Sequence, residues 1–161
     1  MTVVTDTSVV LNLCWLESDS LLTHFFDHVL APVEVRDEFE RLVRSDPRFL
    51  GLIFPAFIEI ANASEIPASL LHEHRLDAGE IATLALALER GIRDILMDER
   101  AGRAVAVSLG LRPSGLLGIL IRAKREGYVP AVLPLLDRLQ IEARFRVSDV
   151  LRAQIAALTS E

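Results

Sequence analysis

Disulfide chemistry is the first thing that this sequence lacks, because Cys14 is the only cysteine among its 161 residues. One cysteine excludes an intramolecular disulfide and a zinc site built on several cysteines. It is typical of the reducing cytoplasm, where we expect the protein to be located. The sequence also opens without a secretory leader, and no apolar run reaches the roughly 18 residues that span a bilayer. We therefore expect neither secretion nor a membrane partner.

Repeats, low-complexity linkers and an excess of positive charge are missing as well. What is present is a chain of 161 residues, of which 51% are apolar and 25% are charged. Such a composition is typical of a folded globular protein with enough apolar side chains for one core. We predict a single domain over residues 1–161.

The net charge of −6 at pH 7 argues at first against a nucleic-acid partner, because phosphate groups favour basic surfaces. The charges are unevenly distributed, however. Residues 98–152 contain ten Lys or Arg and six Asp or Glu, whereas the rest of the chain contains seven basic and seventeen acidic residues. A basic rim beside an acidic site and ordinary solvated helix faces are both compatible with this distribution.

Short apolar segments alternate with segments of helical periodicity along the chain. The pattern predicts strands over residues 2–5, 29–31, 52–54, 57–60, 95–97 and 111–113. Helices are predicted between them, and two more at about 130–140 and 147–158. The alternation predicts an α/β protein with a parallel sheet that helices cover on both faces. In such sheets, ligands bind beyond the carboxyl ends of the strands.

Four acidic residues are placed for a site of this kind: Asp6, Glu38, Glu80 and Asp98. Two of them follow predicted strands, so a parallel sheet would bring both to one edge. The other two lie on predicted helices, at the boundary of an apolar face and in a first turn. Carboxylate oxygens suit Mg²⁺ or Mn²⁺, and a cation would relieve the repulsion among them. The four acids therefore indicate a metal site suited to phosphodiester chemistry.

The first two acids also have purely structural interpretations. Asp6 has the position of a helix N-cap, although Thr7 or Ser8 could supply that cap instead. Glu38 has the position of an ordinary solvated helix residue. Taken one at a time, neither residue identifies a site.

The second two acids are similarly ambiguous. Asp77 and Glu80 have the spacing of a capping box, in which Glu80 reaches back to the backbone rather than into a site. Asp98 ends a predicted strand, whereas Glu99 is expected to begin the helix that follows. Only the combination of all four acids carries weight.

The order of these motifs resembles that of PIN-domain proteins, and more closely the PIN-like group of prokaryotic proteins related to toxin–antitoxin ribonucleases. The resemblance runs from about residue 2 to residue 155. It rests on Asp-Thr-Ser at 6–8, Pro-Val-Glu-Val-Arg-Asp-Glu at 32–38, Asp-Ala-Gly-Glu at 77–80, Met-Asp-Glu-Arg at 97–100, Arg103, Gly-Leu-Leu-Gly at 115–118 and Arg-Ala-Lys-Arg-Glu-Gly at 122–127.

The resemblance implies a three-layer α/β/α sandwich with a central parallel sheet, and a Mg²⁺- or Mn²⁺-dependent endoribonuclease. It implies that the catalytic metal ligands are Asp6, Glu38, Glu80 and Asp98, that Ser8 and Glu99 support them, and that Arg103 and Lys124 contact RNA phosphates. Two positions depart from the family pattern. Glu99 stands where a second aspartate is usual, and Leu116 stands where a polar residue is common.

The expected partners are RNA, an antitoxin protein if the chain is a toxin, and a second copy of the chain in a homodimer. The apolar residues Phe25, Phe26, Ile155 and Leu158 leave both core packing and a dimer face open.

Two other functions remain compatible with the sequence. One is a catalytically weakened PIN-like module that binds RNA or protein, and the other is a metal-dependent phosphatase that uses the same carboxylates. Metal-dependent RNA cleavage, RNA binding without cleavage, and turnover of phosphate monoesters distinguish the three.

Overall fold

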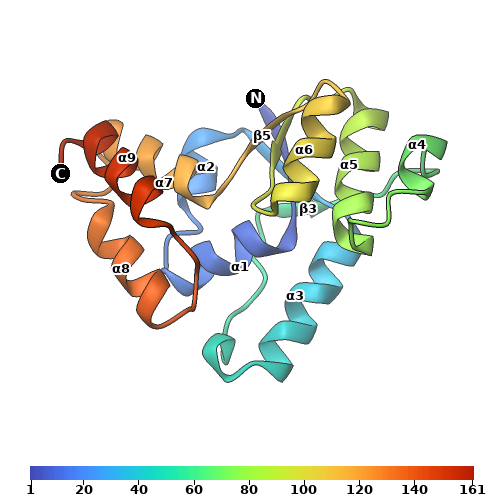
Figure 1. Cartoon of the computed structure of the whole chain (residues 1–161). Helices are drawn as coiled ribbons and strands as arrows, with labels where there is room; N and C mark the ends of the chain where they lie inside the picture. Colours follow the sequence, from blue (N-terminus) through green and yellow to red (C-terminus); the bar gives the residue numbers. More distant parts are fainter. The chain divides into compact units, whose positions relative to one another are not determined.

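The sheet is the centre of the fold, seen here in a computed structural model that describes residues 1–161 (Figure 1). Its strands are β1 (Thr2–Thr5), β2 (His28–Ala31), β3 (Ile58–Ile60), β4 (Asp94–Leu96) and β5 (Arg112–Ser114). All neighbouring strands are parallel, in the order β3-β2-β1-β4-β5. The central strand, β1, is almost wholly buried, which explains its β-branched, apolar sequence.

The strand order reverses direction once, at the central strand β1. The chain proceeds from β1 to β2 to β3 on one side, then crosses back to add β4 and β5 on the other side of β1. Val4 of β1 pairs with Leu30 of β2 and with Ile95 of β4. Ligand sites of open parallel sheets lie beyond the carboxyl ends of the strands at such a reversal, here between β1 and β4.

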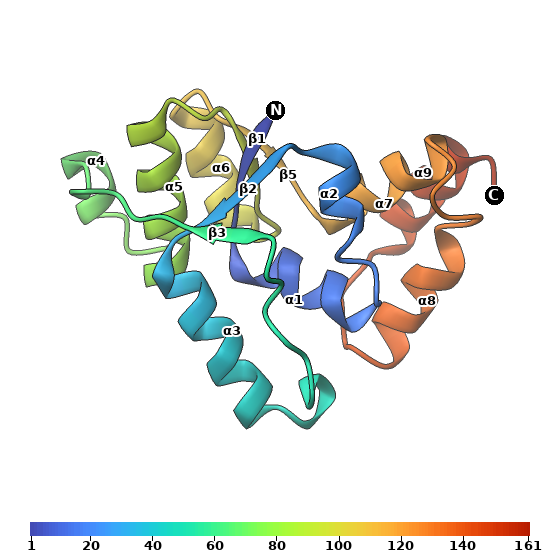
Figure 2. The ribbon, with the colours of Figure 1, turned by 180° about the vertical axis from the view of Figure 1, so that it is seen from behind.

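Helices cover both faces of this sheet, as the two views in Figures 1 and 2 show. The helices of residues 1–115 are α1 (Thr7–Trp15), α2 (Leu21–Phe25), α3 (Val33–Ser45), α4 (Ala68–Leu71), α5 (Ala78–Arg90) and α6 (Arg100–Ser108), with a 3₁₀ turn, η1 (Pro47–Phe49), after α3. Helices α5 and α6 lie on one face and α2 on the other. On the α5–α6 face, Val4 and Ile95 pack in one buried cluster with Leu84 and Val105.

The segment from Leu116 to Glu161 forms a compact unit of its own, distinct from Met1–Gly115. It contains α7 (Leu116–Arg125), α8 (Leu133–Ile141) and α9 (Asp149–Thr159), and both α7 and α8 contact α9. Leu120, Leu136 and Ile155 are among its buried residues. That the two units form one domain over residues 1–161 stays a prediction.

The structure confirms the α/β class and corrects one predicted strand. Residues 52–54 form no strand: Ile53 is 83% exposed, and the ring of Phe54 packs edge-on against Phe39 of α3 at 5.3 Å between centroids. Of the four apolar residues considered for a dimer face, Phe25 and Ile155 are buried, whereas Leu158 is exposed.

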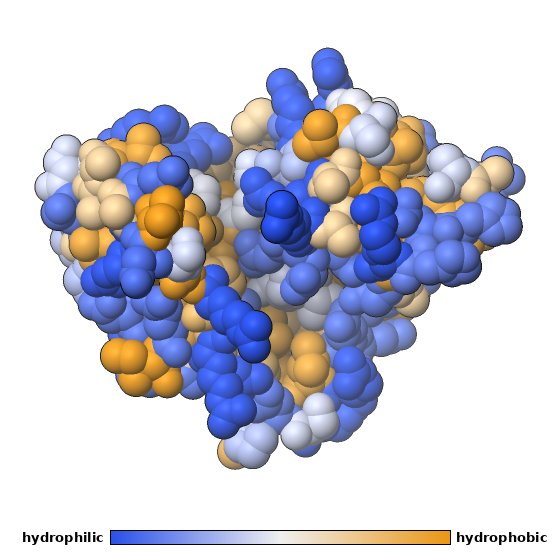
Figure 3. Space-filling model, viewed as in Figure 1, coloured by the Kyte–Doolittle hydropathy of each residue, from blue (hydrophilic) through white to orange (hydrophobic).

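The face of the molecule drawn in Figure 3 is largely polar. Hydrophilic side chains cover much of the face drawn in Figure 3, with smaller apolar patches between them. None of the helices combines the length and the apolar character that a membrane span requires.

Candidate functional site

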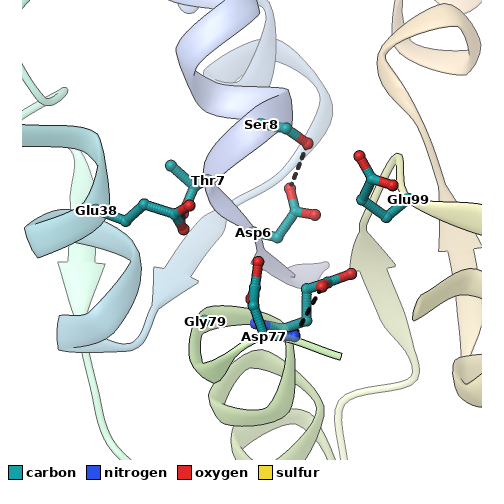
Figure 4. A pocket seen from close by; sticks show the side chains of 8 residues that line it. Asp6, Thr7, Ser8, Glu38, Asp77, Gly79 and Glu99 are labelled. Atoms are coloured by element: carbon teal, nitrogen blue, oxygen red, sulfur yellow. Dashed lines mark hydrogen bonds between the residues drawn. The ribbon is translucent and has the colours of Figure 1, made fainter. Parts of the chain in front are cut away.

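An acidic pocket opens where β1 ends and α1 begins (Figure 4). Its cavity measures about 110 Å³. The lining residues are Asp6, Thr7 and Ser8 at the start of α1, Glu38 of α3, Asp77, Gly79 and Glu80 at the start of α5, and Glu99 just before α6. Three helix starts and one helix face therefore meet at the reversal point of the sheet.

Asp6 is fixed by both the sheet and the helix that follows it. Its backbone N–H donates to the carbonyl of Leu96 (2.9 Å), and its Oδ1 accepts from the N–H of Val9 (3.3 Å) and the hydroxyl of Ser8 (3.4 Å). The residue is thus the N-cap of α1 and a pocket residue at once. Burial raises the pKa of its carboxyl well above the usual range, and the nearby charge of Asp98 raises it further.

Glu38 reaches the pocket from α3 and is held by Thr7. The Thr7 hydroxyl donates to Glu38 Oε2 at 2.7 Å, and a guanidinium nitrogen of Arg41 lies 3.9 Å from Oε1. A Cβ at Gly79 would lie 3.2 Å from the same Oε2, so the glycine allows α5 to begin close beside this carboxylate. The side chain is 31% exposed, as expected at the boundary of the buried face.

Glu80 uses its two carboxylate oxygens differently. Oε1 accepts from the N–H of Asp77 (3.1 Å), while Asp77 Oδ1 accepts from the N–H of Glu80 (2.8 Å), which completes a capping box. Oε2 is buried and has no hydrogen-bond partner. Burial raises the pKa of Glu80 to about 7; the Asp77 N–H lowers it, and the charges of Asp77 and Glu99 add to the increase. The structural and functional interpretations of this residue are therefore compatible.

Asp98 lies near the pocket but does not line it. Its charge acts on Asp6, which places the two carboxyl groups in one electrostatic environment. A Cβ at Gly115 would lie 2.5 Å from Asp98 Oδ1 and 2.9 Å from Arg103 Nη1, and the same nitrogen donates to the carbonyl of Met97 (3.3 Å). Gly115 thus leaves room for an acid and a cation side by side.

The structure brings some of the predicted site residues to the pocket and leaves others outside it. It brings five of them to the pocket, namely Asp6, Ser8, Glu38, Glu80 and Glu99. Asp98 and Arg103 lie together beside Gly115. Lys124 belongs to the other compact unit and pairs with Glu161 at 3.2 Å. Sequence reasoning missed Thr7, Asp77 and Gly79 as lining residues, although all three stand within motifs that it had singled out.

The donor chemistry of the pocket fits a hard divalent cation. The pocket offers carboxylate and hydroxyl oxygens, and Mg²⁺ usually takes few carboxylates and keeps several waters. The buried, unpartnered oxygen of Glu80 and the raised pKa of Asp6 are both features that a cation would relieve. No group of three or more His, Cys, Asp or Glu side chains forms a ready-made cage, however.

The fold and pocket together define a class of protein: an open parallel α/β sheet with buried carboxylates at its reversal point. A family model described as a PIN domain matches residues 2–161, and the chain belongs to this PIN-domain family. PIN domains are generally nucleases, and they typically use divalent metal ions. No match to a curated protein or to a solved structure was found.

Proposed function

We propose that this chain is an endoribonuclease that depends on Mg²⁺ or Mn²⁺, with Asp6, Glu38, Glu80 and Asp98 as its metal-holding acids. The supporting observation is the convergence of carboxylates from α1, α3 and α5 on one pocket, with one Glu80 oxygen buried and without a partner. The membership in a family of nucleases is consistent with this chemistry.

The chain's own residues prepare the pocket for this reaction. Ser8 and the Val9 N–H orient Asp6, Thr7 orients Glu38, and the Asp77 N–H engages only one oxygen of Glu80. A bound divalent cation would stabilise negative charge on the phosphodiester and lower the pKa of a bound water. Arg103, which lies beside Gly115 together with Asp98, would contribute further positive charge toward a phosphate.

The proposal extends to biological context. We propose that the chain acts on RNA in the cytoplasm as a homodimer, and that it is the toxin of a toxin–antitoxin pair. An antitoxin protein would then cover the acidic pocket. Co-purification of the full chain with a protein encoded next to it, and loss of RNA cleavage in that complex, would test this part.

The direct test is RNA cleavage by the purified chain with Mg²⁺, Mn²⁺ or a chelator. Cleavage is expected with metal and not with chelator, and Asp6→Asn should reduce the rate by a factor of at least about 100. Asn caps helices as well as Asp, so this variant should fold normally. Glu40→Gln, an exposed carboxylate on α3 outside the pocket, is the matched control and should cleave like the wild type.

Two results would contradict the proposal. RNA binding without cleavage under either metal would favour the catalytically weakened binding module. Release of phosphate from small monoesters without RNA cleavage would favour the phosphatase.

A further inference from the structure

A second concave surface lies within the unit Leu116–Glu161, where α8 connects to α9. It is an open groove of about 570 Å³, lined by Gln140, Arg144, Phe145, Arg146, Val147 and Ser148. Strongly hydrophilic side chains gather over this connection in Figure 3. None of these residues belongs to the acidic pocket.

Two arginines flank an aromatic ring in this groove. Arg144 and Arg146 are exposed, and neither forms an ion pair with any carboxylate of the chain. Arg152 of α9, by contrast, is paired with Asp137 at 2.7 Å. Phe145, which lies between the two arginines in the sequence, is only partly buried. The groove thus offers two uncommitted cations and one ring.

The connection is preorganised rather than loose. The N–H of Phe145 donates to the carbonyl of Leu139 (2.9 Å), and the Gln140 side-chain amide donates to the carbonyl of Val147 (3.1 Å). These two hydrogen bonds hold Phe145 and Val147 of the connection against α8. A preformed surface loses less conformational entropy when a ligand binds.

Arg144 occupies a backbone position that suits glycine better. Its φ is 57°, in the left-handed region that commonly ends a helix. Gly91 and Gly127 take this conformation after α5 and α7, whereas Glu17 and Ser160 take it after α1 and α9. Glycine adopts this conformation without the steric cost that a Cβ brings. The backbone therefore gives no reason for an arginine at this position, which directs attention to its side chain.

We propose that the α8–α9 groove binds single-stranded RNA, with Arg144 and Arg146 on phosphates and Phe145 stacked on a base. Single strands are bound by basic grooves that follow the backbone and by aromatic rings that stack on bases. An acidic protein segment would use the two arginines and leave the ring without a role. This inference rests on the proposed function, since it adds to the nuclease pocket a surface that holds the substrate.

The test measures binding of a fluorescently labelled oligouridine to the full chain by anisotropy, in the Asp6→Asn background that prevents cleavage. Arg144→Gly should weaken binding about tenfold, and the Arg144→Gly/Phe145→Leu double variant should weaken it further. The melting temperature of Arg144→Gly should stay the same or rise, because glycine suits this φ. Arg90→Gln removes an exposed arginine of α5 and should bind like the parent.

The outcomes separate this inference from the proposed function. If the wild type cleaves RNA but Arg144→Gly and Arg146→Gln bind oligouridine like the parent, the groove inference is overturned alone. If the wild type cleaves nothing but these variants lose oligouridine binding, the inference stands and the nuclease proposal fails. The inference would also be overturned if the parent did not bind the labelled oligouridine. The same holds if oligoglutamate displaced the labelled oligouridine and unlabelled oligouridine did not.

Discussion

Burial of the Glu80 carboxyl, which we propose helps to hold a metal ion, lowers the stability of the folded protein. Its folded-state pKa of about 7 lies above the usual 4.5, so folding makes the ionised form less favourable. The resulting penalty is absent below about pH 4.5, grows as the pH rises to about 7, and stays constant above. Without metal, the folded state therefore loses stability over this window.

Glu80→Gln should remove that penalty while keeping the capping box, since Gln also serves at this position. In chelator, we expect the variant to be more stable than the wild type by on the order of 1–3 kcal/mol at pH 8 and equally stable at pH 4. Denaturant unfolding at both pH values measures this. If the variant were only as stable as the wild type at pH 8, or less stable, this result would contradict the raised pKa of Glu80. The same variant should bind Mn²⁺ more weakly.

Thr7 acts on the proposed reaction through Glu38 rather than directly. Thr7→Val removes the 2.7 Å hydrogen bond to Glu38 Oε2 and keeps the shape of the side chain. Groups that orient metal ligands typically contribute roughly 10- to 100-fold to affinity or rate, and we expect a loss in that range. Thr23→Val removes a hydroxyl that bonds only its own turn of α2, and it should cleave RNA normally. Equal rates for the two variants would show that Thr7 has no positioning role.

At the scale of single residues, the sequence predicted which residues line the pocket better than it predicted which residues they contact. Asp6, Glu80 and Glu99 could be selected because strand ends and helix starts are local signals, and Glu38 because the apolar face of a helix shows as a periodic pattern. The bond between Thr7 and Glu38 joins residues 31 positions apart, and it depends on how α1 packs on α3. No local pattern encodes that packing, so the role of Thr7 became visible only in the structure.

Among the elements, α6 shows how a glycine can define a site. Gly102 lies inside this helix, where alanine would normally be more stable by about 1 kcal/mol. A Cβ there would clash with Met97 Sδ and would lie 2.7 Å from Glu80 Oε2. The bare Cα is what lets α6 pack against the carboxylate.

Gly102→Ala should therefore destabilise the protein, by about 1–3 kcal/mol as in other overpacked interiors, and should lower the affinity for Mn²⁺. Denaturant unfolding and metal titration give the two readouts. Val107→Ala is the control on the same helix, because Val107 is 62% exposed and alanine favours helix. A Gly102→Ala protein that is as stable as this control would mean that α6 moves freely away from Glu80.

Most elements could be predicted because their signals are periodic or local. Asp46-Pro47 ended α3, and Gly91 in the left-handed region ended α5. Residues 52–54 misled the prediction because an apolar run does not say what it packs against. Phe54 packs on Phe39 of α3 instead of joining the sheet, and only tertiary structure decides between these outcomes.

For the whole molecule, the relevant property is the separation of charge. The net charge of −6 would repel RNA, yet residues 98–152 carry a basic excess that includes the unpaired Arg144 and Arg146. Two phosphate contacts on a single strand give a salt exponent of about 1.4. We therefore expect oligouridine affinity to fall about sevenfold between 50 and 200 mM salt. Affinity that does not change with salt would exclude phosphate contacts as the main source of binding.

The strand order has a consequence for how the protein is made. Asp6 is held by the carbonyl of Leu96, so its environment exists only once β4 has inserted beside β1. Chains emerge from the ribosome N-terminus first. A nascent chain that has released β1, α3 and α5 but not β4 carries three of the four proposed acids in an incomplete site. If the proposed ribonuclease activity requires the complete site, a nascent chain would be unable to cleave the messenger from which it is being translated until β4 has emerged.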